Sequence, residues 1–587
     1  MSVPSTGERQ AAYAATLVDE WTRGGVTDAV VCPGSRSTPL ALALARAPGI
    51  TVHVRLDERG AGFFALGVAM MTGRPPVVCT TSGTAAAELH PSVVEADLAG
   101  VPVLVCTADR PPDLHEVGAP QTLRQTALFG TAVRWFFEPG PVDGFPEGAW
   151  RSLGARALAE AASGPRGPGP VHLNLAFVDP LTADPGPLPP GRPDGRRWHD
   201  VVAPIASPGG RAGELVRRWR GRRGLLVAGG GCGPPPAVAA LADALAWPLV
   251  ADPRSGCRSR RGPVVAAADA FLRDPEVRSA LRPDAVLLIG APPASKALAG
   301  YLAEAGHAGA EVVAVDPWWR WRDPERLVGE THVADPGAWV AEALAEASPG
   351  LHEAPGVWLG LWERAERAAQ EAIDEVLDAE AGGVPSEPAL SRRLLGALPA
   401  GTTLVVSSSM PVRDLEWYAP PMEVPPIVLA NRGANGIDGV SATAQGVAAA
   451  ADGPVVGLLG DLAFLHDASS LVRPAGPGLG RCTLVVVDNG GGGIFSFLPQ
   501  ATALDGVRFE QLFGTPQAPD VAAVATGFGL PVVEPVSLDD LAEALAHTVG
   551  HHPLAVVRVR VRGRADNVAL HDRIHAAVAE AVAPLSH

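Results

Sequence analysis

Short runs of strand-forming residues alternate with helical patterns along most of the chain. Between residues 28 and 107 the runs DAVVCPG, ITVHVRL, PPVVCTT and VPVLVCTADR are separated by segments with helical periodicity. Strands that alternate with helices in this way form parallel sheets that the helices cover on both faces. We therefore expect an α/β fold built from doubly wound parallel-sheet domains.

Changes in composition divide the 587 residues into three such units, since a chain of this length is too long for one core. The Pro- and Gly-rich stretch DPGPLPPGRPDG is typical of a linker. The charged stretch WERAERAAQEAIDEVLDAEAGG has a helical pattern and leads into further strand-like runs. We predict domains at residues 1–185, 200–350 and 385–587, with a helical connector at residues 356–384.

The charge and cysteine content exclude several classes of protein. A formal net charge of -16 argues against broad binding to nucleic acid or to an anionic membrane surface. The six cysteines show no CxxC spacing, and four lie in or beside apolar runs, so we expect buried thiols in a reducing compartment. The first residues lack the pattern of a signal peptide and no apolar run could cross a bilayer. These features predict a cytoplasmic protein without membrane insertion.

The glycines of the second unit could suggest a dinucleotide site. Gly229, Gly230, Gly231 and Gly233 follow a strand-like run, but three prolines stand where the third glycine of a GxGxxG motif would fall. This departure from the motif argues against nicotinamide binding.

Two polar side chains follow neighbouring strand-like runs in the third unit. Asp461 ends the run PVVGLLGD, and Asn489 follows LVVVD 28 positions later, before four glycines. Mg²⁺ bound to a diphosphate needs few protein oxygens, such as one carboxylate, one amide and one carbonyl. Taken singly, Asp461 could cap a helix and Asn489 could begin a turn. Together, and at this spacing, they favour a metal site over those structural roles.

This arrangement resembles the metal-diphosphate signature of thiamine-diphosphate enzymes. By that resemblance Asp461, Asn489 and the carbonyl of Gly491 would hold Mg²⁺ or Mn²⁺. The implied cofactor-binding segment comprises Gly460, Asp461, Leu462, Asn489 and Gly491. Asp488 stands where the family usually has Asn, and it adds a carboxylate for which the sequence suggests no role.

The same resemblance implies a catalytic glutamate. In VRLDERGAGFFALGVA, Glu58 follows a strand-like run and begins a Gly- and Ala-rich helical pattern. In the family a glutamate at this place shares its proton with the aminopyrimidine of the cofactor, a task that burial favours. The alternative is a carboxylate that only stabilises the first turn of a helix.

Seven stretches in the same order narrow the resemblance. They include CPGSRSTPLALALA, TADRPPDLHEVGAPQTLRQ, SSSMPVRDLEW and NRGANGIDGVSATAQG, and they resemble the 2-succinyl-5-enolpyruvyl-6-hydroxy-3-cyclohexene-1-carboxylate synthase family. The resemblance implies a transferase of menaquinone biosynthesis that decarboxylates 2-oxoglutarate and adds the succinyl-semialdehyde carbanion to isochorismate. It also implies that residues 1–185 bind the aminopyrimidine and residues 385–587 the diphosphate. In each active site, the aminopyrimidine-binding side and the diphosphate-binding side would come from different subunits of a homodimer or a dimer of dimers.

Both substrates are dicarboxylates, so an acidic protein must gather cations around them. Arginine suits this role because its planar fork can hold a carboxylate through two hydrogen bonds. The substrate-binding residues implied by their positions in the motifs are Ser35, Arg36, Gln121, Lys296, Ser409, Arg413 and Arg432. Arg110 and Arg124 also lie within the matching stretches, and Arg110 is counted with the substrate-binding residues. Their structural alternatives are a loop before a helix for Ser35 and Arg36, and a surface pair with Asp414 for Arg413.

Apolar residues of the same motifs are expected to shape the site. The resemblance implies that Ile437 keeps the cofactor bent and that Ile494, Phe495 and Leu498 form a wall over the reacting centre. Ordinary core packing is the alternative for all four. Two other functions remain open at this point: a different thiamine-diphosphate carboligase or decarboxylase, similar to acetolactate synthase, and a catalytically silent binding protein with this fold.

Overall fold

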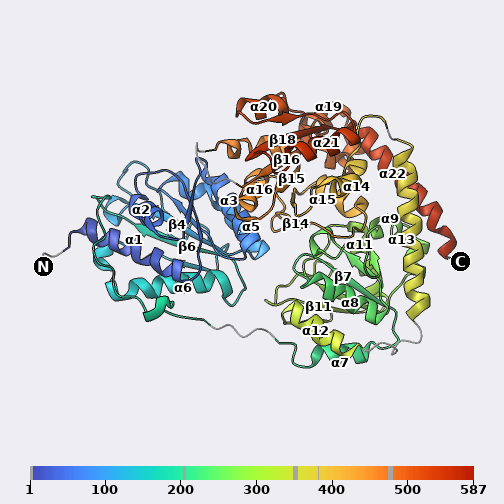
Figure 1. The fold of residues 1–587 in the computed structure, drawn as a ribbon, viewed down its shortest axis with the longest axis horizontal. Coiled ribbons are helices and arrows are strands. Elements are labelled where there is room, and N and C mark those ends of the chain that lie inside the picture. Colours follow the sequence, from blue (N-terminus) through green and yellow to red (C-terminus); the bar gives the residue numbers. More distant parts are fainter. Residues whose placement is uncertain (1–3, 202–206, 348–354, 381, 474–479, 587) are drawn as a thin grey trace.

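The computed structural model describes residues 4–201, 207–347, 355–380, 382–473 and 480–586. Within them lie three six-stranded sheets, all of whose strands run parallel, with helices on their faces (Figure 1). The predicted fold class, three doubly wound α/β domains, is confirmed. The N-terminal and C-terminal units lie side by side and the central unit lies below the latter in the view of Figure 1.

The N-terminal sheet has the strand order β2-β1-β3-β4-β6-β5. Its strands are β1 (Asp28–Val31), β2 (Thr51–Val54), β3 (Val77–Thr80), β4 (Val103–Asp109), β5 (Trp135–Phe137) and β6 (Pro170–Ala176). Its helices are α1 (Thr6–Arg23), α2 (Thr38–Arg46), α3 (Glu58–Thr72), α4 (Thr84–Glu88), α5 (His90–Ala99) and α6 (Trp150–Ser163). The four residues of β3 are all buried, as expected for a strand covered by helices on both faces.

The C-terminal sheet repeats this topology with the order β14-β13-β15-β16-β18-β17. Its strands are β13 (Thr403–Val406), β14 (Ile427–Leu429), β15 (Val455–Gly460), β16 (Cys482–Asp488), β17 (Val532–Val533) and β18 (Leu554–Arg560). Its helices are α14 (Glu387–Ala397), α15 (Met410–Tyr418), α16 (Val440–Ala450), α17 (Asp461–His466), α18 (Gln500–Ala503), α19 (Gly506–Phe509), α20 (Val521–Gly527), α21 (Leu538–Thr548) and α22 (Arg564–Val582).

The central sheet has a different order, β12-β11-β10-β7-β8-β9. Counted along the chain this is the 3-2-1-4-5-6 order of dinucleotide-binding folds, although the glycine motif is absent. Its strands are β7 (Gly224–Ala228), β8 (Leu249–Ala251), β9 (Val264–Val265), β10 (Ala285–Ile289), β11 (Glu311–Val315) and β12 (Glu330–His332). Its helices are α7 (Arg211–Arg218), α8 (Pro235–Leu245), α9 (Ala268–Phe271), α10 (Pro275–Ala280), α11 (Lys296–His307) and α12 (Pro336–Glu346).

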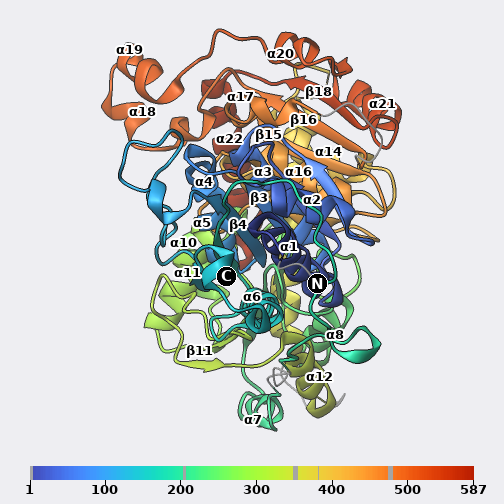
Figure 2. The same ribbon diagram turned by 90° about the vertical axis from the view of Figure 1, so that its left-hand side faces the viewer.

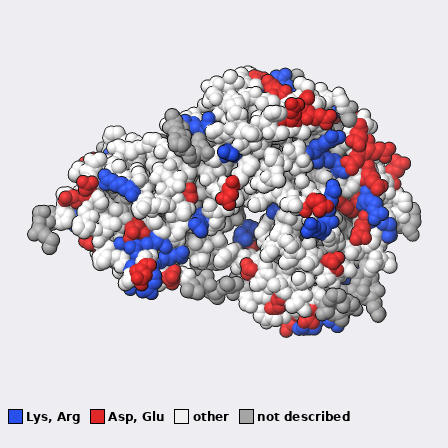
Figure 3. Space-filling model, in the orientation of Figure 1, with Lys and Arg blue, Asp and Glu red and all other residues white. Residues whose placement is uncertain are grey.

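The stretch predicted as a helical connector contains α13 (Pro355–Asp378). This helix packs along α22 and against the central unit, where Trp362 and Ile373 join one buried cluster with Val227 and Ile574 (Figure 1). Acidic side chains gather at this edge of the molecule in Figure 3, in keeping with the Asp- and Glu-rich sequence of α13. The Pro- and Gly-rich linker after the N-terminal unit contacts that unit. Arg151 Nε of α6 donates a hydrogen bond to the carbonyl of Pro189 at 3.0 Å, so the linker is held more firmly than its composition predicts.

The N-terminal and C-terminal units meet through α3 and α16, which pack closely and lie together in Figure 2. Gly67 and Gly446 allow this approach, since a Cβ on either would come within 2.1 Å of a backbone carbonyl oxygen on the other helix. Glu95 of α5 strengthens the contact by accepting hydrogen bonds of 2.6 Å from the backbone N–H of Gly433 and of Ala434. Because Glu58 is the first residue of α3, this packing fixes its position relative to the C-terminal unit.

All six cysteines are buried and unpaired, as predicted. The nearest pair is Cys232 and Cys257 in the central unit, whose Sγ atoms lie 3.8 Å apart. Among the described residues no helix is both long and apolar enough to cross a membrane.

Candidate active site

The carboxyl ends of four adjacent strands bring the predicted polar residues of the C-terminal unit to one edge of its sheet. Arg432 follows β14, Ser409 follows β13, Asp461 follows β15 and Asn489 follows β16. Ligands of open parallel sheets bind at this edge because the strand ends there leave side chains and backbone groups unpaired. Residues that are far apart in the sequence therefore face one region.

Asp461 and Gly491 are in direct contact. Asp461 is the first residue of α17, whose cap is Gly460, so capping does not explain this carboxylate. One carboxylate oxygen accepts the N–H of Leu462 at 2.7 Å and the other accepts the N–H of Gly491 at 2.8 Å. Burial raises the pKa of Asp461 to about 6, and the nearby Asp488 carboxylate acts in the same direction. A cation at this place would offset the cost of burying that charge.

Asn489 presents a buried oxygen that has no partner. Its Nδ2 donates to a carboxylate oxygen of Glu387 at 2.8 Å, while its Oδ1 is buried without a hydrogen bond among the described residues. A buried amide oxygen without a partner is costly unless an ion or water binds it. Together with the single carboxylate of Asp461, this atom fits a Mg²⁺ site completed by diphosphate oxygens.

The glycines after Asn489 form a tight turn. Gly491 has φ of +134°, and a Cβ there would lie 2.1 Å from the carbonyl oxygen of Gly514. A Cβ on Gly493 would lie 2.5 Å from Nδ2 of Asn489 itself. Side chains at these positions would displace the loop, so the run provides close packing and not a flexible hinge.

Asp488 is paired with an arginine of the neighbouring strand. Its carboxylate accepts hydrogen bonds from Arg558 Nε at 2.7 Å and from Arg558 Nη2 at 2.6 Å. Both side chains are largely buried, with exposed fractions of 15% and 8%. The arginine compensates the additional charge beside the predicted metal-binding loop, residues 489–493, a role that the sequence alone did not suggest.

Glu58 is half-buried at the first position of α3, after the cap residue Asp57. Burial raises the pKa of Glu58, and the carboxylates of Asp57 and Glu88 act in the same direction. This is the direction that proton sharing with a heterocyclic nitrogen requires. The next residue, Arg59, donates to the carbonyl of His466, at the opposite end of α17 from Asp461 (2.9 Å). Within one chain the helix α17 therefore lies between the two predicted halves of the site.

Two of the predicted arginines, Arg413 and Arg432, lie near a third, Arg254, which the sequence reasoning missed. Burial lowers the pKa of Arg432, and the guanidinium groups of Arg254 and Arg413 act in the same direction. Arg413 Nη1 donates to the carbonyl of Ser409 at 2.6 Å, while Asp414 faces His571 at 3.5 Å, so the predicted alternative of a pair between Arg413 and Asp414 does not hold.

Arg254 comes from the central unit, where Asp252 binds its guanidinium through two hydrogen bonds of 2.9 and 2.8 Å. The signal that could have found it is its place just after β8, at the carboxyl end of a strand.

The predicted residues Arg36, Arg110 and Gln121 of the N-terminal unit already have hydrogen-bond partners within the protein. Arg36 is buried, with Nη1 donating to the carbonyl of Phe177 at 2.8 Å and to Asp179 at 3.4 Å. Arg110 lies near enough to lower the pKa of Arg36 further, after burial, and the Nε atoms of both are buried without a partner among the described residues. Gln121 holds a backbone φ of 55° and donates to the carbonyl of Ser82 at 3.1 Å.

The remaining predicted residues are accessible. Ser35, Arg124 and Lys296 are exposed, the last as the first residue of α11. Ile437 is 37% exposed in the loop before α16, so ordinary core packing does not account for it. Ile494 and Phe495 lie in the 3₁₀ turn Gly493–Phe497 directly after the metal loop and are half-buried, as is Leu498.

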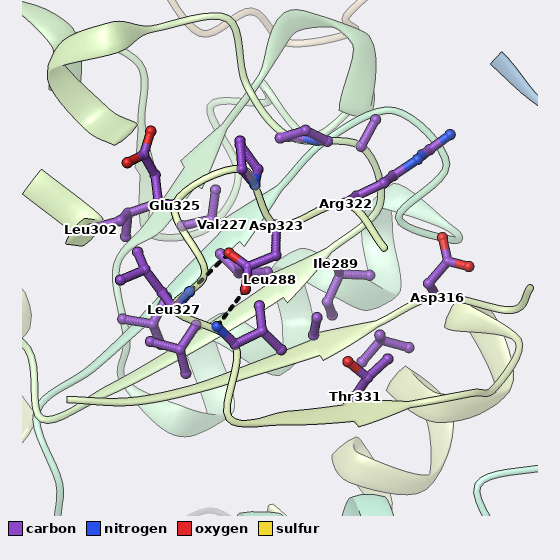
Figure 4. Close-up of a pocket in the computed structure, with 18 of the residues that line it drawn as sticks. Val227, Leu288, Ile289, Leu302, Asp316, Arg322, Asp323, Glu325, Leu327 and Thr331 are labelled. Atoms are coloured by element: carbon purple, nitrogen blue, oxygen red, sulfur yellow. Dashed lines mark hydrogen bonds between the residues drawn. The ribbon is translucent and has the colours of Figure 1, made fainter. Parts of the chain in front are cut away.

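A large cavity lies elsewhere, in the central unit. Its volume is about 460 Å³, and it is lined by apolar side chains of the sheet such as Leu288 and Ile289 (Figure 4). The loop over it is held by Asp323, which accepts hydrogen bonds from the N–H groups of Leu327 at 3.0 Å and Val328 at 2.8 Å (Figure 4). None of the predicted catalytic or metal-binding residues lines this cavity.

Comparison with known proteins agrees with this geometry. Three family models match in order: the thiamine pyrophosphate enzyme N-terminal TPP binding domain at residues 8–128, the middle domain of thiamine pyrophosphate enzymes at residues 208–406, and the C-terminal TPP binding domain at residues 419–559. The chain is 42% identical to the 2-succinyl-5-enolpyruvyl-6-hydroxy-3-cyclohexene-1-carboxylate synthase of Chloroflexus aurantiacus over 99% of each chain.

Proteins of the same name from two other bacteria give similar matches. The identity is 42% for Kineococcus radiotolerans, covering 97% of this chain and 99% of the relative, and 37% for Bacillus velezensis, covering 97% and 98%. The chain therefore belongs to the thiamine-diphosphate-dependent enzymes, and within them to the 2-succinyl-5-enolpyruvyl-6-hydroxy-3-cyclohexene-1-carboxylate synthase family.

Proposed function

We propose that this enzyme decarboxylates 2-oxoglutarate and adds the remaining four-carbon unit to isochorismate, giving 2-succinyl-5-enolpyruvyl-6-hydroxy-3-cyclohexene-1-carboxylate and CO₂ in menaquinone biosynthesis. The observation that carries the proposal is the meeting, at one sheet edge, of the metal-binding loop with Arg413 and Arg432. A dianionic donor and a dianionic acceptor require such cations, and the arginines are partly buried, where their attraction for carboxylates is stronger than in water.

The residues of the C-terminal unit would hold the diphosphate through a divalent cation. Asp461 would supply a carboxylate oxygen, Asn489 its unpartnered Oδ1, and Gly491 its carbonyl oxygen. Mg²⁺ suits this set because it takes few protein oxygens and keeps phosphate and water as its other ligands. When bound, thiamine diphosphate supplies an electron sink for the carbon that loses CO₂.

The substrate carboxylates would be bound by Arg413 and Arg432, with Arg254 of the central unit and the exposed Lys296 as further cations. Ile494 and Phe495 would exclude water from the reacting centre, and Ile437 would support the cofactor from the other side. Arg36, Arg110 and Gln121 would contribute from the N-terminal unit. Substitution of each of these residues singly tests the role proposed for it.

We propose further that a complete site needs two subunits. Burial raises the pKa of both Glu58 and Asp461, but the other groups that shift the two pKa values differ. They are Asp57 and Glu88 for Glu58, and Asp488 and the N–H of Gly491 for Asp461, so the two residues have different neighbours within one chain. Glu58 of one subunit would then hold or release a proton at the aminopyrimidine bound by its partner. A homodimer or a dimer of dimers would supply two such sites for each pair of chains. The unpaired cysteines are consistent with a reducing cytoplasm.

The experiment that tests this function supplies thiamine diphosphate, Mg²⁺, 2-oxoglutarate and isochorismate, and follows the loss of isochorismate together with the product mass. We expect the succinyl adduct and one CO₂ for each isochorismate consumed. Pyruvate offered as a competing donor distinguishes another carboligase, whose adduct would carry a two-carbon unit. If the enzyme binds the cofactor but forms no succinyl adduct, the assignment is wrong.

A further inference from the structure

A buried group of polar side chains lies directly behind the metal-binding loop and has no part in the chemistry described above. Glu387, Asp414, His571 and Tyr418 are each no more than 3% exposed. Tyr418 Oη lies 2.7 Å from Nδ1 of His571, and Nε2 of His571 lies 3.5 Å from the Asp414 carboxylate. Glu387 lies at the end of this group that touches the metal loop, through its contact with Asn489.

The orientation of an asparagine amide is decided by its partners, because its oxygen accepts and its nitrogen donates. Oxygen and nitrogen occupy nearly the same volume, so shape alone cannot select between the two orientations. A carboxylate can only accept. Glu387 therefore selects the orientation in which Nδ2 of Asn489 faces the carboxylate at 2.8 Å and Oδ1 faces away from it.

The position of Glu387 is itself well determined. It is the first residue of α14, between the cap residue Ser386, whose Oγ accepts the N–H of Ala389 at 3.3 Å, and Pro388. On its other side lies Asp414 of α15, the helix that carries Arg413, and α14 packs against α15. Glu387 thus connects the helix that carries a substrate arginine with the loop that binds the metal, 102 positions further along the chain.

We propose that Glu387 is a positioning residue that turns the amide of Asn489 so that its oxygen, and not its nitrogen, faces the divalent cation. This inference rests on the metal site proposed above. It assigns Glu387 no contact with the substrate or the cofactor, and its action is through Asn489 alone. Partners of this kind behind a metal ligand typically change metal affinity by 10-fold to 100-fold when they are removed.

The first test compares Glu387→Leu with Glu387→Gln. Leucine removes the acceptor, so nothing holds the amide with its oxygen toward the cation, and Nδ2 of Asn489 is left buried without a partner. Glutamine keeps an acceptor oxygen for Asn489 and turns its own Nε2 toward Asp414, whose Oδ1 is buried without a partner among the described residues. The measurement is the Mg²⁺ concentration needed for half-maximal thiamine diphosphate binding, followed by calorimetry or by tryptophan fluorescence.

We expect the Mg²⁺ requirement to rise about 10-fold to 100-fold for Glu387→Leu and less than about threefold for Glu387→Gln. Saturating Mg²⁺ should restore cofactor binding to Glu387→Leu. If Glu387→Leu binds cofactor at the wild-type Mg²⁺ concentration, the proposal is overturned. Equal losses in both variants, which saturating Mg²⁺ does not restore, would indicate a purely structural role and would also overturn it. Failure of the wild-type enzyme to bind cofactor would instead refute the metal site itself.

A second test exchanges donor and acceptor, and it holds even if Glu387→Leu folds poorly. Asn489→Asp places a carboxylate against Glu387, with no hydrogen atom between them. Adding Glu387→Gln supplies that hydrogen from Nε2, so the pair is restored with its polarity reversed. We expect the double variant to bind Mg²⁺ at least about tenfold more tightly than Asn489→Asp alone, since contacting residues couple in such cycles. Effects of the two substitutions that simply add would overturn the proposal.

Discussion

Replacing Gly67 by alanine should separate the helices that join the N-terminal and C-terminal units. The added Cβ would lie 2.1 Å from the carbonyl oxygen of Thr443 and 2.8 Å from the backbone N of Val447, whereas real Cβ atoms essentially never approach closer than 3.0 Å. These neighbours are backbone atoms of α16, so no side chain can move aside. Restoring an ordinary contact requires α3 and α16 to separate by roughly 1 Å, and overpacking of this size costs about 1–3 kcal/mol.

A matched control is available in α11. Gly300 is also a helical glycine, but a Cβ there meets nothing within 4 Å. Gly300→Ala should stabilise the protein by about 0.5–1 kcal/mol through helix propensity alone. Urea unfolding of both variants measures the difference, and calorimetry at fixed Mg²⁺ shows whether displacing the start of α3 also weakens cofactor binding. If Gly67→Ala is as stable as Gly300→Ala, the contact between α3 and α16 is not as close as described.

Three further predictions follow from single contacts. Arg558→Met leaves the largely buried Asp488 carboxylate unpaired and should lower the free energy of unfolding by about 3–5 kcal/mol, a loss that adding Asp488→Asn should largely reverse; a double variant as unstable as the single one contradicts the pairing. Burial lowers the pKa of His172 from 6.5 to about 3, so its neutral form stabilises the fold above pH 6.5 and this contribution is lost as the pH falls toward 3. The free energy of unfolding of His172→Gln should therefore fall less steeply with decreasing pH in that range, by about 1.4 kcal/mol per pH unit. Urea unfolding at pH 6.5 to 4 measures this slope, and a slope equal to that of the wild type refutes the prediction. Glu58→Gln should retain Mg²⁺-dependent cofactor binding and lose most turnover, while Glu88→Gln, an exposed neighbour, should retain both; near-normal turnover of Glu58→Gln in the product assay would remove Glu58 from its role.

The parts of the site that lie at strand ends could be predicted from the sequence, because each follows a recognisable apolar run. Asp461 after β15 and Asn489 after β16 are of this kind, and the pairing of adjacent parallel strands brings them to one edge. The periodic alternation of strands and helices likewise predicted three parallel sheets. The order of the central strands was not predictable, since it depends on crossovers that composition does not specify.

Residues that act through another side chain could not be found in this way. Glu387 is 102 positions from Asn489, and Arg558 is 70 positions from Asp488. Each lies in an ordinary helix or strand, where its residue type is compatible with a surface position. Only the folded chain shows that it is buried against the predicted metal-binding loop. Arg254 does follow a strand, β8, but its place near Arg413 and Arg432 depends on how the central and C-terminal units pack.

The most direct test of a site shared between subunits uses two inactive variants together. Glu58→Gln and Asp461→Asn are coexpressed, all of the oligomers are purified together without separating the mixed ones, and formation of the succinyl adduct is measured against each variant alone and the wild type. In a mixed dimer one site carries both substitutions and the other carries neither. With random association, half of the dimers are mixed, so we predict about a quarter of the wild-type rate. A mixture no more active than the separate variants would show that Glu58 and Asp461 serve the same chain.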